Sequence, residues 1–434
     1  MTLLVISPDY ASHLYPLATL ATAWRDAGER VVIATGPATD GLVRAFGYAW
    51  AHLQLGRGSN PGVIRAEEQP SGEDDALRGF FDATRLGAVE TLTFQARARR
   101  SDLLWDPVGV ARAVERVVEA VAPDEVIVDH LAFGARLALS ANGIRHADVV
   151  LGHPSALTVG DEVYGLPPAF PRRLQPSASE LAGLRAVCEE VRDEFTDQWN
   201  DALAVLAPRA AASPDAFAET GDVLLLNYPG ALHPAERTRL LPAHAFLGSA
   251  VRSEPRDDEV DAWLAAGDRP VVYVSLGSFL SVRSDVLAAV AEALRGLDVR
   301  VALAHGSTPV EAIGPLPEAW FVREVLPQVT LLRLAGLAVS HGGNNSVTEA
   351  LTAGVPMLLL PLSTDQFAGA AALEAAGLAE VLDPNALSHS EIREVSSRLL
   401  HLAGEPRDRL AALAAELVEV PGASRARAAL QPTP

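Results

Sequence analysis

The segment Ser340-His341-Gly342-Gly343-Asn344-Asn345-Ser346-Val347-Thr348-Glu349 decides how the second half of the chain folds. Residues 337–340 form a short apolar run, typical of a buried parallel strand, and residues 347–353 have helical periodicity without an internal Gly or Pro. We therefore predict a strand, a glycine-rich turn and a helix. Glycine lets the backbone approach a ligand closely, and the first turn of a helix has unpaired N–H groups, so this turn has the geometry to hold a phosphate.

The polar residues of this turn also have purely structural explanations. Ser346 and Glu349 have the spacing of a capping box, and His341 could be a hydrogen-bonded histidine at a strand end. A plain helix start, however, does not require so many polar residues and glycines in one turn. A second polar pair, Asp365-Gln366, follows the next predicted strand.

These residues resemble the nucleotide-sugar signature of family-one, UDP-glycosyltransferase-like enzymes of the macrolide glycosyltransferase type. The resemblance rests on residues 341–346 with Glu349, on Gly354-Val355-Pro356, and on Asp365-Gln366. Leu326-Pro327-Gln328 resembles the start of the same signature. The resemblance is close over residues 325–366 and looser over the entire chain. It implies the GT-B fold, an α/β architecture in which two doubly wound, Rossmann-like domains face each other across a cleft.

The composition excludes several other classes of protein. A net charge of −20 over 434 residues argues against nucleic acid as a partner. All 35 basic residues are arginine, so there is no P-loop lysine and no lysine for a pyridoxal phosphate Schiff base. The single cysteine, Cys188, suits a reducing cytoplasm, and no run of 18 apolar residues predicts a membrane span. The first 16 residues lack the cationic start of a secretory signal.

Alternating apolar runs and helical patterns predict two α/β halves with mostly parallel sheets. The predicted strands are 3–6, 30–35, 48–53, 125–128, 146–151, 222–227, 245–247, 271–275, 300–304, 337–340, 357–360 and 380–382. The predicted helices are 16–28, 74–100, 107–121, 133–141, 180–206, 285–294, 365–376, 390–403 and 407–418. Residues 54–75 and 154–176 are predicted to be irregular loops.

We divide the chain at the polar, charged stretch around residues 249–258, which we interpret as a linker. Residues 1–248 are predicted to form an acceptor-binding domain, and residues 259–418 a nucleotide-sugar-binding domain. In the family that the chain resembles, the last helices cross back onto the first domain. The tail 419–434, with a candidate helix at 424–430, is the segment that would do so here.

His13 is our candidate for the catalytic base, because it lies at the carboxyl end of the first strand, where open α/β sheets bind their ligands. Composition alone would favour a loop histidine without a role. The resemblance implies a catalytic histidine shortly before a helix-opening proline, as His13 lies before Pro16, although Ser12 replaces the usual glycine. Asp129 would then orient and stabilise His13. The alternatives are a helix N-cap role for Asp129, or His130 acting in its place.

The resemblance also implies the residues that bind the donor, a UDP-sugar or TDP-sugar used as co-substrate. Glu349 would bind the ribose, Gln328 would lie beside the base, and Asp365 with Gln366 would contact the sugar, which favours an intact hexose such as glucose. Val325 departs from the family's usual tryptophan, for which Trp320 or Phe321 could substitute. The diphosphate would be held by Ser278, His341, Gly343, Asn344, Asn345 and Ser346.

We expect no metal and no other cofactor, because the acidic pairs Asp74-Asp75 and Asp257-Asp258 lie in charged segments and are best explained as solvated. Phe80, Phe81 and Phe94, with Trp105, are candidates for a hydrophobic acceptor pocket, although they could equally be core. The predicted activity is inverting transfer of a hexose to a hydroxyl of a small molecule such as an antibiotic or another natural product, by a monomer or homodimer. The alternatives are a nucleotide-sugar epimerase or hydrolase, or a non-catalytic nucleotide-sugar binder.

Overall fold

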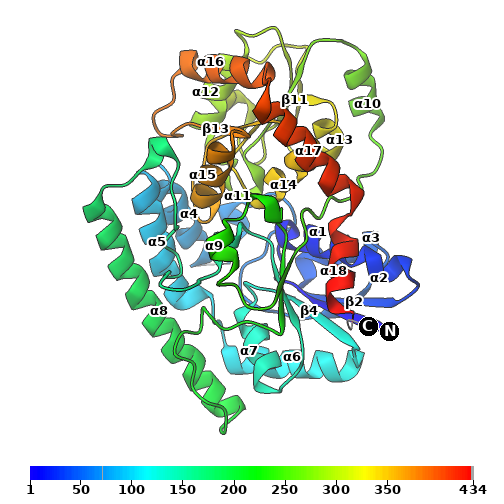
Figure 1. The fold of residues 1–434 in the computed structure, drawn as a ribbon, viewed down its shortest axis with the longest axis vertical. Helices are drawn as coiled ribbons and strands as arrows, with labels where there is room; N and C mark the ends of the chain where they lie inside the picture. The colour runs from blue at the N-terminus through cyan, green and yellow to red at the C-terminus, as the bar shows by residue number, and fades with distance from the viewer. Residues whose placement is uncertain (71, 432–434) are drawn as a thin grey trace.

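The computed structural model describes residues 1–70 and 72–431, which form two lobes, each built on a parallel sheet (Figure 1). In the N-terminal lobe the strand order is β3-β2-β1-β4-β5-β6-β7, and in the C-terminal lobe it is β10-β9-β8-β11-β12-β13. The N-terminal strands are β1 (Thr2–Ile6), β2 (Arg30–Thr35), β3 (Ala49–His52), β4 (Glu125–Asp129), β5 (Ala147–Val150), β6 (Val223–Leu226) and β7 (His244–Phe246). The C-terminal strands are β8 (Val271–Ser275), β9 (Arg300–Ala304), β10 (Phe321–Arg323), β11 (Ala335–Ser340), β12 (Met357–Leu359) and β13 (Ala379–Val381). The predicted α/β class with two doubly wound sheets is confirmed.

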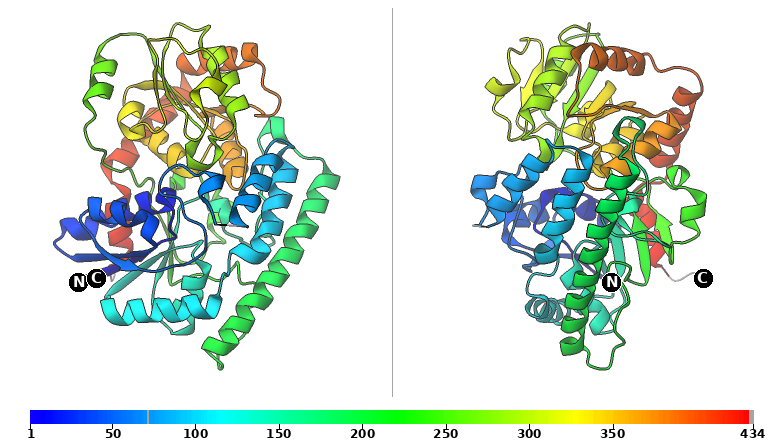
Figure 2. Two further views of the ribbon diagram at one scale, coloured as in Figure 1. Left: turned by 180° about the vertical axis from the view of Figure 1, so that it is seen from behind. Right: turned by 90° about the vertical axis from the view of Figure 1, so that its left-hand side faces the viewer.

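Helices cover both faces of each sheet (Figures 1 and 2). The N-terminal lobe contains α1 (Ala11–Leu20), α2 (Thr22–Asp26), α3 (Asp40–Ala45), α4 (Glu73–Ala83), α5 (Ala88–Asp102), α6 (Pro107–Val121), α7 (Phe133–Ala141), α8 (Ala178–Leu206) and α9 (Ala235–Thr238). The C-terminal lobe contains α10 (Asp258–Ala265), α11 (Gly277–Leu280), α12 (Ser284–Leu294), α13 (Gln328–Leu332), α14 (Asn344–Thr352), α15 (Gln366–Ala376), α16 (His389–Leu400) and α17 (Glu405–Glu419). A last helix, α18 (Gly422–Leu430), ends the described chain.

The apolar strands of the C-terminal lobe explain its layered packing. Val272 and Val274 of β8 contact the core under α12 and α16, whereas Tyr273 between them contacts the core under α14, α15 and α17. Successive side chains of a strand point to opposite faces, so a continuous apolar run is buried on both sides. The strands of both sheets are therefore held in a fixed register. Residues at the strand ends can then position a site.

Helix α18 leaves the C-terminal lobe and packs on the N-terminal lobe (Figure 1). It contacts α1, α2 and β7, and Ala426 is fully buried in the core beside Trp24. Arg427 also forms an ion pair of 2.8 Å with Glu29. The last three residues of the predicted tail 419–434 lie outside the described residues, as does Ser71 in the predicted loop 54–75.

Two predicted helices are wrong in their bounds, and one strand was not predicted. Helix α1 begins at Ala11 and contains Pro16, which we predicted as its first residue. The single helix predicted over residues 74–100 is two helices, α4 and α5, separated by a turn in which Gly87 has a φ of +116°. Strand β10 was not predicted, because only three residues of the sequence pair there.

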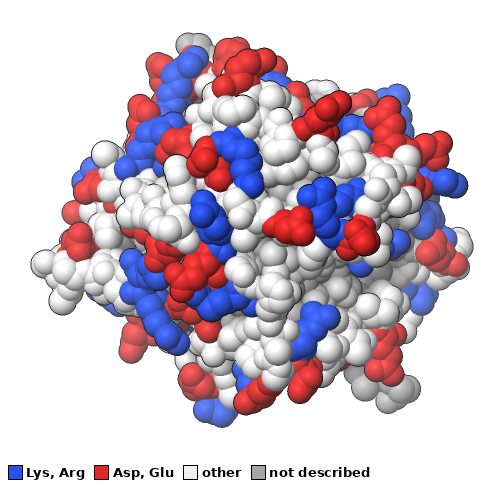
Figure 3. Space-filling model, turned by 90° about the horizontal axis from the view of Figure 1, so that it is seen from above, with Lys and Arg blue, Asp and Glu red and all other residues white. Residues whose placement is uncertain are grey.

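Two features concern possible partners: the distribution of charge on the surface and the apolar character of the helices. Arg side chains and Asp or Glu side chains are interspersed over the face drawn in Figure 3 rather than separated into regions of one sign. Within residues 1–70 and 72–431, no helix combines the length and the apolar character that crossing a membrane requires.

Candidate active site between the lobes

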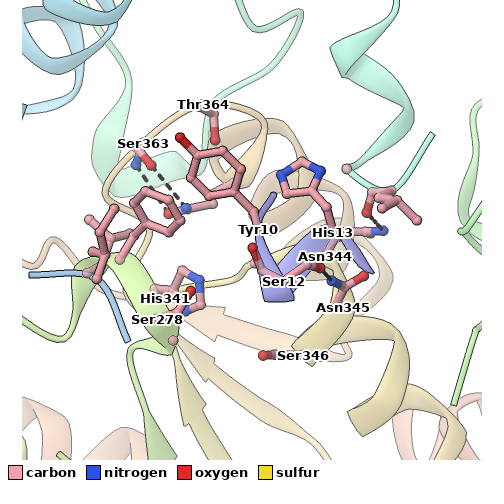
Figure 4. Close-up of a pocket in the computed structure, with 18 of the residues that line it drawn as sticks. Tyr10, Ser12, His13, Ser278, His341, Asn344, Asn345, Ser346, Ser363 and Thr364 are labelled. Carbon is pink, nitrogen blue, oxygen red and sulfur yellow. Dashed lines mark hydrogen bonds between the residues drawn. The ribbon is translucent and has the colours of Figure 1, made fainter. Parts of the chain in front are cut away.

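A cavity of about 830 Å³ lies between the two lobes and is lined by residues of both (Figure 4). Most of the site residues predicted above line it. From the N-terminal lobe these are His13, Phe80 and Phe94; from the C-terminal lobe they are Ser278, Gln328, His341, Gly343, Asn344, Asn345, Ser346, Glu349, Asp365 and Gln366. Asp129 lies behind His13, and Phe81 is not among the described lining residues. Figure 4 shows His13 on α1 and His341 on the other lobe, on separate sides of the cavity.

His13 and Asp129 form a hydrogen-bonded pair in which Asp129 is fully buried and His13 is partly exposed. His13 lies in the first turn of α1 and Asp129 is the last residue of β4, and their Nδ1 and Oδ2 atoms are 2.7 Å apart. Burial alone would lower the pKa of His13, but the Asp129 carboxylate, through its charge and this hydrogen bond, together with Asp365, raises that pKa above its usual value. Burial would raise the pKa of Asp129, but His13, His130 and the Leu131 N–H hold it below its usual value.

The two alternative roles for this region are not what the structure shows. Helix α7 is capped by Ala132, so Asp129 is not its N-cap. His130 does not replace Asp129: its Nδ1 is 3.9 Å from Asp129 Oδ1, and burial lowers the pKa of His130 to about 4. His13 is therefore the histidine of the pair, and Asp129 its carboxylate.

Pro16 explains how α1 is joined to the other lobe. Proline has no N–H, so Pro16 cannot donate to the carbonyl of Ser12, four residues earlier. Asn345 of α14 donates to that carbonyl instead, at 2.9 Å. The Asn345 amide oxygen accepts from Asn227 Nδ2 at 3.3 Å. The nitrogen and the oxygen of the Asn345 side-chain amide thus both form hydrogen bonds between the lobes. One of these bonds is to Ser12, the residue before His13.

The glycine-rich turn after β11 encloses His341. A Cβ atom at Gly277 would lie 2.6 Å from His341 Cε1, and one at Gly343 would lie 2.5 Å from His341 Nε2. The ring therefore fits only because both neighbours are glycine. Burial lowers the pKa of His341 to about 4, so at neutral pH the ring is an uncharged hydrogen-bond donor.

Helix α14 begins directly after this turn, at Asn344, with Gly343 as its N-cap. Its first N–H groups have no intrahelical acceptor, and residues 343–346, to which they belong, line the cavity. Ser346 does not cap the helix, so the capping-box explanation is wrong. Ser346 Oγ instead donates to Gln328 Oε1 at 3.3 Å.

Glu349 is held in a buried network. Its Oε1 accepts from Arg252 Nη1 at 2.8 Å, and its Oε2 accepts from the Gln328 side chain. Burial raises the pKa of Glu349, and the charge of Arg252 opposes that shift. Arg252 also pairs with Glu254 at 2.9 Å. We missed Arg252 because we interpreted its charged surroundings as a solvated linker.

Asp365 is the N-cap of α15 and Gln366 its first residue, and both are held by hydrogen bonds. Asp365 accepts from the His153 backbone N–H and from Thr364 Oγ1, the latter at 2.8 Å. Gln366 uses both ends of its amide within the loop, accepting from Leu362 N at 3.0 Å and donating to Ser363 Oγ at 3.0 Å.

Thr364, between Ser363 and Asp365, has a φ of +49°. Such a conformation is strained for a β-branched residue and is typical of functional loops. No pattern in the sequence indicates it.

Asn344 bridges the lobes as well as lining the cavity. Its Nδ2 donates at 2.8 Å to the carbonyls of Leu151 and Asn227 in the N-terminal lobe. Donor binding by Asn344 and Asn345 stays a prediction that concerns their backbone N–H groups, because these side chains already have partners.

Two sets of aromatic predictions need correction. Phe81 is buried against Phe80, with ring centroids 5.7 Å apart, and Trp105 lines a separate groove beside α6. Trp320 is packed into the core of the C-terminal lobe, and Phe321 packs on Trp263, so neither is among the described lining residues.

A second aromatic pair that lines the cavity was not predicted. Tyr10 stacks on Phe279, with centroids 6.0 Å apart and an interplanar angle of 27°. Tyr10 also lies edge-on to His13, at 6.1 Å. This pair crosses the lobes, so only the tertiary structure brings it together.

No group of three or more His, Cys, Asp or Glu side chains suited to a metal ion occurs in the described part of the chain.

Comparison with known proteins agrees with this geometry. Residues 187–401 match the family described as UDP-glucoronosyl and UDP-glucosyl transferase. The oleandomycin glycosyltransferase of Streptomyces antibioticus is 30% identical over 218 residues, which cover 49% of each chain. The 4'-demethylrebeccamycin synthase of Lentzea aerocolonigenes is 27% identical over 421 residues, covering 94% of this chain and 93% of the relative.

The fold is also found among solved structures. The glycosyltransferase VinC, solved in complex with DTDP, superposes with a TM-score of 0.65 at 22% identity, over 99% of this chain and 98% of VinC. For several curated relatives the match spans only about half of the relative's length. The family match includes the glycine-rich turn and the Asp365 loop, and the structural match covers both lobes. Residues 187–401 thus match the UDP-glucoronosyl and UDP-glucosyl transferase family, and the chain has the GT-B fold of the solved glycosyltransferase structures.

Proposed function

We propose that the protein transfers a hexose, glucose by preference, from a UDP-sugar or TDP-sugar to a hydroxyl of a hydrophobic small molecule, with inversion and without a metal ion. The observation that supports this most strongly is the His13–Asp129 pair, 2.7 Å apart, at the wall of a cavity whose opposite wall is the glycine-rich turn. A nucleotide-sugar binder without catalytic function has no use for such a pair.

In the proposed reaction His13 acts as the general base. Its Nδ1 faces Asp129, so Nε2 takes the proton of the acceptor hydroxyl while that oxygen attacks the anomeric carbon. The bond from that carbon to the diphosphate oxygen breaks as the new carbon–oxygen bond forms. Asp129 stabilises the imidazolium, as the carboxylate of a catalytic triad does.

The leaving diphosphate would be held on the C-terminal lobe. The uncharged His341 ring, the first N–H groups of α14 and the hydroxyls of Ser278 and Ser346 are hydrogen-bond donors, and donors fixed in place strengthen as negative charge develops. Base and leaving group on opposite walls favour attack from the face opposite the diphosphate, which inverts the anomeric centre. Such donors can stabilise the diphosphate without a metal ion.

The substrates follow from the same residues and from the relatives. Glu349 would bind the ribose, Gln328 would lie beside the base, and Asp365 would bind sugar hydroxyls. The oleandomycin relative and the VinC complex support a natural-product acceptor and a donor diphosphate of the UDP or TDP type. A cytoplasmic location and the choice between monomer and homodimer stay predictions.

The test combines a base variant with a matched control. His13→Ala should lower the rate of transfer about 10²–10⁴-fold, while UDP binding measured by calorimetry stays close to that of the unmodified protein. His52→Ala, which changes an exposed histidine of the same lobe, should leave the rate unchanged. Mass spectrometry of products from UDP-glucose and TDP-glucose with a panel of phenols and alcohols gives the readout. Equal rates for His13→Ala and the unmodified protein would remove His13 as the base.

A chelator tests the proposed independence of metals. Transfer should continue at the same rate in EDTA, because the donors named above belong to the protein. Loss of transfer in EDTA and its return with Mg²⁺ would contradict this part of the proposal.

A further inference from the structure

Within the described part of the chain, one charged side chain on the acceptor side of the cavity has no partner of opposite charge. Arg99 lies on α5 and is one of two arginines that line the cavity. The other, Arg252, pairs with Glu254 and Glu349. Among the residues that the structure describes, no carboxylate oxygen lies within 4 Å of the Arg99 guanidinium, and no hydrogen bond from it is found.

The groups that hold Arg99 in place are uncharged. Its guanidinium carbon lies 4.7 Å from the centre of the Tyr164 ring, a cation–π contact. Its Nη1 lies against the backbone of Gly165, where a Cβ atom would come within 3.2 Å of it. Cys188 Sγ lies on the same side of Gly165, where that Cβ atom would come within 3.4 Å of it; burial raises the pKa of the thiol to about 11, so the thiol is neutral. These contacts fix the orientation of the cation but do not neutralise it.

The neighbouring arginine shows that a partner was available. Arg100 forms ion pairs of 2.9 Å and 3.1 Å with Glu190 and Glu194 of α8. Of the two arginines that line the cavity in the described part of the chain, Arg99 is the one without an ion pair. A partly buried guanidinium loses hydration, and an anion supplied by a ligand would compensate for that loss.

The position of Arg99 is on the acceptor side, close to the sugar subsite. Gln95, one helical turn before it, accepts a hydrogen bond of 3.2 Å from Thr364 N, next to Asp365. The charge of Arg99 opposes the rise in the pKa of Asp365 that burial causes, although the two side chains form no ion pair. Apolar side chains of Phe80, Phe94 and Leu166 line the same side of the cavity.

We infer that Arg99 recognises a carboxylate on the acceptor, so that the preferred acceptors are hydrophobic hydroxy acids. This inference rests on the proposed function for the identity of the ligand as an acceptor. A guanidinium offers two parallel N–H donors to a carboxylate, whereas an ester offers no charge to pair with.

The experiment compares 6-hydroxy-2-naphthoic acid with its methyl ester. Binding of each is measured by fluorescence titration in the presence of UDP. The unmodified protein should bind the acid about 10- to 100-fold more tightly than the ester. Arg99→Gln should abolish this preference by weakening binding of the acid alone. Arg99→Lys keeps the charge but not the two parallel N–H donors, so it should retain part of the preference.

Arg97→Gln is the matched control, because Arg97 lies on the same helix, is exposed and does not line the cavity. It should leave the preference for the acid intact. Equal binding of acid and ester by the unmodified protein, an equal loss in Arg97→Gln, or no binding of the acid at millimolar concentration would each overturn the inference. So would a loss of UDP-glucose affinity in Arg99→Gln in place of the loss for the acid, because that result assigns Arg99 to the sugar.

Binding is measured without turnover, so the two proposals can fail separately. The protein could prefer the acid in a way that depends on Arg99 and yet transfer no sugar. That result would contradict the proposed transferase function and support the anion site.

Discussion

At the scale of single residues, the His13–Asp129 pair decides how the site responds to pH. His13 can accept a proton only when it is neutral, and Asp129 raises its pKa above the usual value of about 6.5. The rate should therefore rise with pH through a pKa above that value. Asp129→Asn removes the charge but leaves the burial, so the rising limb should move to lower pH. The maximum rate should also fall, by about 10²–10⁴-fold, because the imidazolium loses its stabilising carboxylate.

The measurement is the pH dependence of kcat/KM with one accepted phenol whose own ionisation lies above the range studied. Urea unfolding of Asp129→Asn shows whether the variant is folded. A rising limb that stays in place in a folded Asp129→Asn would mean that the limb reports a group other than His13.

The pair itself was predictable at this scale, and several of its neighbours were not. Asp129 ends one buried strand and His13 comes shortly after a neighbouring one, and parallel strands bring their carboxyl ends to one edge of the sheet. Tyr10 was missed because its partner Phe279 comes from the opposite lobe, and Arg252 because its partner Glu349 lies 97 residues further along the chain. Periodicity within one segment contains no information on contacts of that kind.

At the scale of elements, the turn between β11 and α14 depends on glycine for space as well as for conformation. Gly343 has a φ of −59°, which any residue can adopt, so Gly343→Ala tests space alone. The new Cβ would lie 2.5 Å from His341 Nε2 and would push the ring out of place. Overpacking of this kind costs about 1–3 kcal/mol, and we expect UDP to bind about 10-fold more weakly or worse.

Gly183→Ala is the control, since a Cβ atom there meets nothing within 4 Å and alanine favours a helix such as α8. It should leave UDP binding unchanged in the same calorimetric assay. If Gly343→Ala bound UDP as tightly as Gly183→Ala does, the enclosure of His341 would have no part in holding the diphosphate.

Most elements could be predicted from the sequence because both sheets are buried on two faces and their strands are continuous apolar runs. The start of α1 was misplaced because proline favours the first helical position, whereas here Pro16 is tolerated inside the helix by a donor from the other lobe. Strand β10 is three residues long and pairs only with β9, too short for a periodic pattern.

At the scale of the whole molecule, the arrangement of the lobes depends on polar contacts between them. Asn344 donates to two N-terminal carbonyls, Asn345 to a third, and Arg283 to the carbonyl of Thr84 at 3.0 Å. Arg283 is almost fully buried, and it also bonds Asn385 at 2.8 Å. A few hydrogen bonds of about 0.5–1.5 kcal/mol each are enough to set the balance between open and closed forms.

Asn344→Ala should shift that balance towards the open form, because it removes two of these bonds and leaves two buried carbonyls without donors. A ligand that needs the closed form then binds more weakly in proportion to the fraction that remains closed.

Spin labels on cysteines introduced at the exposed positions Arg112 and Arg393 report the separation of the lobes. Cys188 is buried and its thiol is neutral, so it should not compete for the label. In Asn344→Ala, the distances between the two spin labels, measured by double electron–electron resonance, should be longer or more broadly distributed. Addition of a UDP-sugar should shorten them again. Asn142→Ala, a change at a surface asparagine that bonds Glu115, should match the unmodified protein. Identical distances in Asn344→Ala and Asn142→Ala would mean that other contacts, such as those of Arg283 and α18, hold the lobes together without Asn344.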